Sequence, residues 1–253
     1  MSVVEQTPRR GVIWSGSTSA HIRPWVNDPT CGFLVISGSN GSRMTLPDDV
    51  VLEQWLSTAH QWGYNRIRTS ALTPSLAAPL YDLGFQTAQH LSLLSMTHAD
   101  KPRFNIPKDV APKPVRTARL SRTSTVMSDI ISIDQESFPS PWHLDADALR
   151  EAMRATRTSR LLISRHNSRV DGFVLVGATG STGFLQRLAV RPNARRTGTA
   201  TRLVAAALQW SFKKGCSTTV VNTETTNEAA LGVYASFGFA PMDEGLVVLE
   251  CEL

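Results

Sequence analysis

The sequence has 253 residues, of which 42% are hydrophobic and 19% charged, a balance typical of a globular protein and not of a disordered chain. Its net charge of +5 comes from basic residues spread along the chain, which does not favour a nucleic-acid partner. No stretch approaches the roughly 18 apolar residues of a membrane helix, and no apolar segment follows the basic residues near the N-terminus. We therefore expect a cytoplasmic protein without a membrane partner.

The three cysteines, Cys31, Cys216 and Cys251, are odd in number and far apart in the sequence. Their spacing fits neither a disulfide framework nor the paired ligands of a zinc site. The six histidines show no ligand spacing either. The sequence therefore predicts reduced thiols and no metal.

The N-terminal half shows a regular order of elements over residues 49–96. A helical pattern ends in Gln-Trp-Gly and is followed by a short strand, a second helical pattern ending in Leu-Gly-Phe, and another strand. Residues 201–250 repeat this order, with a Gln-Trp pair and a Phe-Gly-Phe segment. We interpret the halves as diverged copies of one fold, with coincidence among common αβαβ patterns as the alternative.

A proline-rich segment separates the two halves. Its prolines remove backbone donors and restrict φ, so neither a helix nor a central strand is expected there. We place an N-terminal domain at residues 1–98, a linker at 99–112 and a C-terminal domain at 113–253. The prolines are Pro102, Pro107, Pro112 and Pro114.

The C-terminal half predicts a strand, two helices and then a meander of three strands joined by short turns. Asp145 is the expected N-cap of the second helix. This order predicts an α/β (α+β) fold, with a mixed, mostly antiparallel sheet flanked by helices in each of two domains. The expected elements are strands at 115–120, 160–164, 170–176, 184–190, 218–222 and 245–250, and helices at 123–138, 145–153, 201–213 and 227–237.

The strongest functional signal is the segment 191–204, which follows a predicted strand and begins a predicted helix. Arg195, Gly198 and Ala200 form the spacing Arg-x-x-Gly-x-Ala. A glycine turn that enters a helix points unpaired N–H groups and the positive end of the helix dipole at one spot, which suits a diphosphate. On its own the pattern also fits an ordinary helix start. The glycine patterns of dinucleotide and nucleoside-triphosphate loops are absent.

Residues 113–253 resemble the GNAT superfamily of acyl-CoA N-acyltransferases. The strand and loop at 184–204 are similar to its motif A, and residues 221–239 are similar to its motif B. The segment 136–142, with Asn227 and Tyr234, is similar to the RimI-type protein N-terminal acetyltransferases. Residues 38–49 of the N-terminal half lack the loop spacing, so the chain resembles a tandem GNAT protein with a degenerate N-terminal half.

The resemblance implies acetyl-CoA as a co-substrate, with no metal. It implies that Asn227 contacts the cofactor, although an asparagine before a helix is also a natural N-cap. Tyr234 lies two helical turns further on and would protonate the departing thiolate, or is an ordinary half-buried aromatic. The implied cofactor-binding residues are Leu188, Ala189, Val190, Arg195, Arg196, Thr197, Gly198, Thr199, Ala200, Thr201 and Asn227.

The candidate general base departs from the RimI pattern. That group has a glutamate five residues before its asparagine, and this chain has Asn222 there. Glu224 is the nearest substitute, because residues two apart in an extended segment face the same side. A surface carboxylate at Glu224, with deprotonation by water, is the alternative.

The resemblance thus implies acetyl transfer to a primary amine. The acceptor is either a peptide N-terminus or a small molecule, and the sequence does not choose between them. A non-catalytic acyl-CoA-binding scaffold is the alternative from another class. We expect a monomer or a weak dimer.

Overall fold

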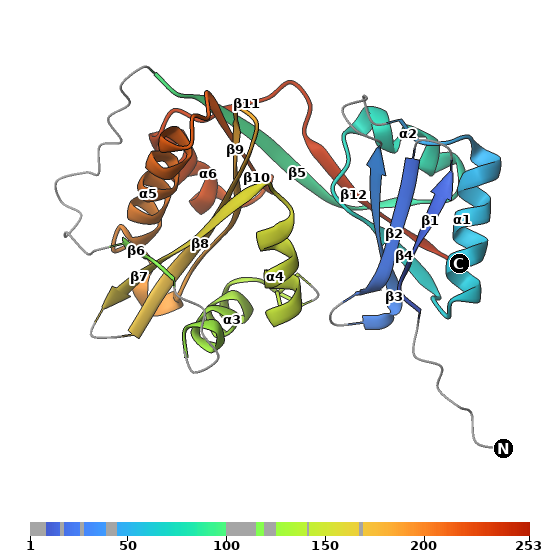
Figure 1. The fold of residues 1–253 in the computed structure, drawn as a ribbon, viewed down its shortest axis with the longest axis horizontal. Coiled ribbons are helices and arrows are strands. Elements are labelled where there is room, and N and C mark those ends of the chain that lie inside the picture. Colours follow the sequence, from blue (N-terminus) through green and yellow to red (C-terminus); the bar gives the residue numbers. More distant parts are fainter. Residues whose placement is uncertain are drawn as a thin grey trace. The chain divides into compact units, whose positions relative to one another are not determined.

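The computed structural model describes residues 9–15, 18–25, 28–38, 45–99, 115–118, 125–140, 142–166 and 169–253 (Figure 1). The chain divides into two compact units. Unit 1 comprises residues 1–92 and 243–253, and unit 2 comprises residues 93–242. The chain therefore leaves unit 1 within a strand, after Ser92, and returns to it after Met242.

Unit 1 is a sheet with two helices packed on one of its faces. The strand order is β1-β2-β3-β4-β12-β5, and all neighbours are antiparallel except β3 and β4, which are parallel. The elements are β1 (Gly11–Ser15), β2 (Thr18–Trp25), β3 (Asp28–Gly38), α1 (Asp49–Gln61), β4 (Arg66–Thr69), α2 (Pro74–Asp82), the first part of β5 (Gln86–Thr97) and β12 (Leu246–Glu252).

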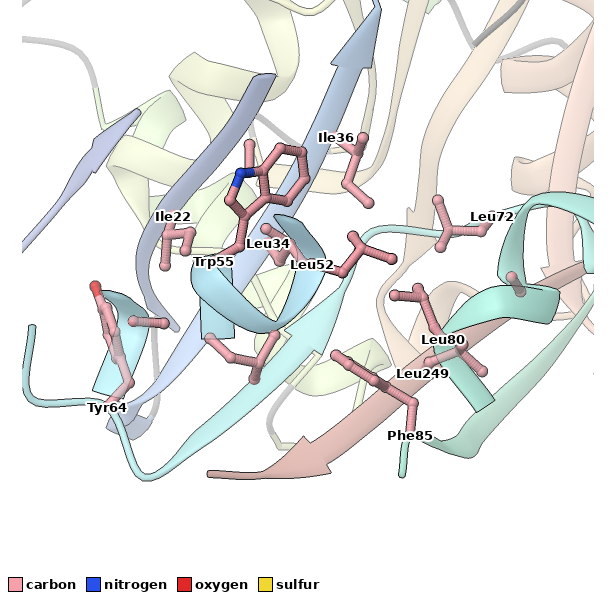
Figure 2. Packing of buried hydrophobic residues seen from close by; sticks show 14 of the residues in the cluster. Ile22, Leu34, Ile36, Leu52, Trp55, Tyr64, Leu72, Leu80, Phe85 and Leu249 are labelled. Atoms are coloured by element: carbon pink, nitrogen blue, oxygen red, sulfur yellow. The ribbon is translucent and has the colours of Figure 1, made fainter. Parts of the chain in front are cut away.

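The core of unit 1 follows from strand alternation. In β2, Ala20 and Ile22 are buried while the residues between them are half-buried, as expected for a strand with one face on a core. Figure 2 shows Leu80 of α2 beside Leu249 of β12, and Trp55 of α1 belongs to the same buried cluster. The last strand of the chain therefore contributes to the core of the first unit.

Unit 2 is a sheet covered by helices on both faces. The strand order is β5-β10-β9-β8-β7-β6, with β11 beside β5; β6 to β9 are antiparallel neighbours, and β9 and β10 are parallel. The elements are the second part of β5, β6 (Val115–Thr117), α3 (Val126–Ser137), α4 (Ala146–Arg154), β7 (Thr158–His166), β8 (Arg169–Thr179), β9 (Thr182–Val190), the 3₁₀ turn Pro192–Ala194, α5 (Thr199–Lys213), β10 (Thr218–Glu224), α6 (Glu228–Ser236) and β11 (Ala240–Pro241).

Strand β8 lies at the centre of unit 2 and is buried along its length from Val170 to Ala178. Val174 and Val176 pack with α5 and α6, whereas Phe173 and Leu175 pack with α3 and α4. A strand covered on both faces has to be apolar on both, which explains its continuous hydrophobic run.

The two units repeat one order of elements, which confirms the expected tandem repeat of one fold. In each, a strand forms a short parallel pair, β3 with β4 and β9 with β10, and a helix connects the two. The repeated glycines also match. Gly63 and Gly215 follow α1 and α5, and Gly84 and Gly238 follow α2 and α6, all with positive φ. Left-handed residues of this kind end helices and favour glycine.

The boundaries of the units differ from the domains expected at residues 1–98 and 113–253. Strand β12 pairs with β4 and with the first part of β5, so residues 243–253 belong to unit 1. Strand pairing between distant segments is not encoded in local pattern, which explains the difference. Residues 100–112 of the expected linker, and 119–120 of the first expected strand, lie outside the described residues.

Because β12 belongs to unit 1, a substitution in the core face of β12 is expected to destabilise unit 1. Leu249 is fully buried in the unit 1 core, so Leu249→Ala is expected to destabilise the protein by about 2–5 kcal/mol. Hydrogen exchange should show the loss of protection in α1 and β2. The exposed Glu252→Ala control should change stability by less than about 0.5 kcal/mol. Loss of protection confined to α5 and β9 would contradict the assignment of β12 to unit 1.

Candidate active site

In unit 2, strand β9 separates from β10 part of the way along its length. The parallel pairing joins residues 182–185 of β9 to residues 218–221 of β10 and ends there. On the other side, the pairing with β8 continues to Val190, with a β-bulge that leaves Gln186 as the extra residue. From Gln186 to Val190, β9 therefore has a strand neighbour on one side only.

The register shows which main-chain groups face the open side of β9. Arg191 N donates to Asp171 O at 2.8 Å, so this pair is hydrogen-bonded across the ladder. In an antiparallel ladder alternate residues face the same neighbour, so Ala189 also faces β8, while Leu188 and Val190 face away from it. In agreement, the Val190 carbonyl accepts a hydrogen bond from Arg195 Nε at 3.2 Å. The open side of β9 thus presents the N–H and C=O groups of Leu188 and Val190.

The loop after β9 turns directly into α5. Arg196 and Gly198 both have positive φ, 60° and 72°, and α5 begins at Thr199 with Gly198 in the capping position. Its first intrahelical bond is Arg202 N to Gly198 O. Within the described part of the chain, the preceding N–H groups donate to no backbone or side-chain acceptor. These groups belong to Arg196, Thr197, Gly198, Thr199, Ala200 and Thr201.

This loop has the electrostatic character of an anion site. Unpaired N–H groups and the helix dipole place partial positive charge at the start of α5. The exposed side chains of Arg195 and Arg196 add full positive charges, and the first turn of α5 contains no acidic residue. These features suit a diphosphate, and its binding at this loop stays a prediction.

Tyr234 packs into the same cluster as the open strand and the loop. It is 4% exposed on α6, and its cluster includes Val190, with Leu188 and Ala200 packed against it. Burial raises the pKa of Tyr234 to about 12, so its phenol stays protonated at neutral pH. Tyr234 thus belongs to the same hydrophobic core as β9 and α5, and its role as the acid stays a prediction.

Asn227 and Glu224 lie around the start of α6. The Asn227 side chain accepts a hydrogen bond from Ala230 N at 3.1 Å, so it caps the helix, whatever further contact it makes. Glu224 ends β10 and is partly buried, and its carbonyl accepts from Asn227 N at 3.0 Å. Asn222 is exposed. A role for Glu224 as base stays a prediction.

An ion pair that was not predicted from the sequence ties β9 to the α3–α4 connection. Asp134 is fully buried and binds Arg187 through two hydrogen bonds of 2.7 and 2.8 Å. Arg187 also donates to Trp142 O at 2.7 Å, and its guanidinium lies 3.4 Å from the centre of the Phe138 ring. Asp134 lies on the apolar face of α3 beside Ile130 and Ile133, and a charge at such a position is a signal for a buried partner.

The contacts of Arg202 were not predicted from the sequence either. It is 2% exposed on the first turn of α5 and donates to Thr197 O at 3.1 Å and to Thr199 Oγ1 at 2.9 Å. Burial lowers the pKa of Arg202, and the charge of Asp171 opposes that shift. This residue holds the loop from the side of the core.

Comparison with known proteins defines the class of this site. Residues 127–239 match the acetyltransferase (GNAT) family, a range that includes β9, the loop, α5 and Tyr234. This part of the chain is therefore similar to GNAT acetyltransferases. Among the described residues, no helix is long and apolar enough to cross a membrane, and no cluster of three or more candidate metal ligands is found.

Individual relatives agree with this class. The chain is 36% identical over 61 residues to an aminoglycoside N(6')-acetyltransferase type 1 from Klebsiella aerogenes, a match that spans 24% of this chain and 40% of that protein. The solved structure of a tandem GNAT protein from the clavulanic acid biosynthesis pathway aligns with a TM-score of 0.67 and 15% sequence identity. The alignment covers 95% of this chain and 81% of that protein. The structure of a GCN5-related N-acetyltransferase from Sphaerobacter thermophilus aligns with a TM-score of 0.61 and 14% sequence identity. The alignment covers 93% of this chain and 76% of that protein.

Two glycines at opposite ends of α5 allow a direct test of the loop. Gly198→Ala and Gly215→Ala both place a side chain at positive φ, and each should cost about 1 kcal/mol of stability. Only Gly198→Ala should weaken coenzyme A binding, since Gly215 lies at the far end of the helix. Calorimetric titration with coenzyme A measures this. Equal affinities for the two variants would contradict a role of the Gly198 turn in binding.

Proposed function

We propose that this chain transfers an acetyl group from acetyl-CoA to a primary amine. The observation that carries the proposal is an interrupted row of main-chain groups without partners among the described residues. Its first part is the N–H and C=O of Leu188 and the N–H of Val190 on the open side of β9, and its second part is the N–H groups from Arg196 to Thr201 at the start of α5. Buried polar groups without partners are costly, so such a row needs a ligand or solvent to satisfy it. A coenzyme with a polar arm and a diphosphate meets both parts of the row.

The two parts of the row would bind different parts of the coenzyme. The Val190 N–H and the main-chain groups of Leu188 would face the pantetheine arm as a neighbouring strand does, whereas Ala189 faces β8 and is buried. The N–H groups from Arg196 to Thr201 would receive the diphosphate. Arg195 and Arg196 would add charge at the rim.

The chemistry assigned to the protein is polarisation and proton transfer. The Leu188 N–H, which is further from the diphosphate loop than Val190, would donate to the thioester oxygen as negative charge develops on it during attack by a neutral amine. Tyr234 would donate its phenolic proton toward the departing sulfur. Glu224 is the candidate base that accepts the proton of the amine, with water as the alternative.

Unit 1 is inferred to lack a second coenzyme site. Its helix α1 begins at Asp49, and the Asp48 carboxylate accepts a hydrogen bond from Val51 N at 3.0 Å. The carboxylate of Asp48 thus caps the start of α1. At the corresponding start of α5 in unit 2, the cap is Gly198 and the preceding loop contains arginines. Anions are repelled where acidic caps already satisfy the helix. The expected stoichiometry is one coenzyme per chain. Residues 39–44, in the corresponding stretch of unit 1, lie outside the described residues.

Two acceptor classes follow from different observations. The local identity to an aminoglycoside acetyltransferase favours a small polyamine-like molecule, but the match spans less than half of that relative. The RimI-like segment at 136–142 favours a peptide α-amine. Its residues Phe138 and Trp142 contact Arg187, which fixes this segment to β9 beside the open region.

An acceptor panel separates these classes. Purified protein is incubated with acetyl-CoA and either N-terminal peptides or small amines, including aminoglycosides, and release of free thiol and mass shifts of the acceptors are recorded. Turnover with one class identifies the acceptor. Tight binding of coenzyme A without turnover on any amine would support the scaffold alternative. Absence of binding would refute the proposed function.

Replacement of Tyr234 tests the proposed acid. Tyr234→Phe should lower kcat by about 10² to 10⁴-fold, the usual contribution of a general acid, with little change in the affinity for acetyl-CoA. Because the pKa of Tyr234 is raised to about 12, the loss should be the same from about pH 6 to 9. Tyr81→Phe is the matched control, since Tyr81 is exposed in unit 1. Unchanged kcat in Tyr234→Phe would remove the residue from the mechanism.

A further inference from the structure

Arg202 begins a directed chain of hydrogen bonds through the loop. Its Nη2 donates to Thr199 Oγ1 at 2.9 Å, Thr199 and Thr197 are joined through their hydroxyls at 3.1 Å, and Thr197 Oγ1 donates to Ala194 O at 2.8 Å. The Thr197 hydroxyl hydrogen is used on Ala194 O, so Thr199 donates to Thr197. All donors therefore point one way, from the buried guanidinium to the 3₁₀ turn.

The second hydrogen bond of Arg202 fixes a peptide plane. Nη1 donates to Thr197 O at 3.1 Å, so this carbonyl points toward α5 and the core. In a trans peptide the C=O of one residue and the N–H of the next point in opposite directions. The N–H of Gly198 therefore points away from the core, and it donates to no other described group.

The same peptide has an accessible alternative. Gly198 has no Cβ and sits at φ 72°, where glycine rotates at little steric cost. A flipped peptide would turn the Thr197 carbonyl outward, and its negative end would repel a phosphate. The bond from Arg202 opposes this flip, because a buried guanidinium loses much free energy when its acceptor leaves.

We propose that Arg202 is a positioning residue that locks the peptide between Thr197 and Gly198 with its N–H outward, and so sets the affinity of the loop for a diphosphate. This inference rests on the proposed coenzyme site. Arg202 itself is buried beneath the loop and acts through the main chain without touching the ligand.

The test compares binding of coenzyme A with binding of pantetheine, which lacks the diphosphate. Arg202→Met should weaken coenzyme A binding about ten- to hundredfold, the range expected for lost hydrogen bonds to a charged group, and leave pantetheine binding unchanged. Arg202→Lys keeps the charge and should fall between wild type and Arg202→Met. Ser211→Ala is the control, because Ser211 is a buried polar residue of the same helix near Gly183, away from the loop.

A second variant tests the proposal if Arg202→Met does not fold. Thr199→Val removes the hydroxyl chain with almost no change in volume, and it should weaken coenzyme A binding in the same selective way. Coenzyme A affinities within twofold of wild type in the folded variants would overturn the proposal. Equal losses for coenzyme A and pantetheine would overturn it too, since they indicate general disorder of the site. Wild-type protein that binds no coenzyme A would refute the proposed function instead.

Discussion

The site depends on the separation of β9 from β10 after Leu185. A strand in a sheet normally uses its main-chain groups on both sides, and β9 does so over four residues before the β-bulge at Gln186. Beyond that point, the main-chain groups of Leu188 and the N–H of Val190 face no strand, while the Val190 carbonyl accepts from Arg195 and Ser137. The same departure directs the chain into the 3₁₀ turn and the left-handed Gly198, which sets the start of α5 beside the open strand.

Side chains then hold this opened geometry from both faces of the sheet. Arg187 and the buried Asp134 secure β9 to α3 and to the connection that carries Trp142. Arg202 secures the loop to α5 from the core. A strand end that lacks a neighbour has lost half of its hydrogen bonds, so charged groups with several donors replace part of what the sheet no longer supplies.

Local signals in the sequence predicted the elements of unit 2 and the glycine turn before α5, because contiguous residues determine both. The helix expected at 201–213 is observed at Thr199–Lys213, and the strand expected at 184–190 is observed at Thr182–Val190. The partners of Arg187 and Arg202 were not predicted. Asp134 is separated from Arg187 by 53 residues, and which of the chain's many carboxylates meets a given arginine is decided by packing. The place of β12 was missed for the same reason, since its partners lie more than 150 residues away.

The position of β12 also has a consequence for the order in which the protein is made. Most of unit 1 precedes unit 2 in the sequence, yet Val247 and Leu249 of its core follow unit 2 and are translated after it. During synthesis β4 and the first part of β5 lack the strand that lies between them, leaving two unpaired edges in the nascent chain. All of unit 2 is translated before β12. The sheet of unit 1 can therefore be completed only after unit 2 has been synthesised.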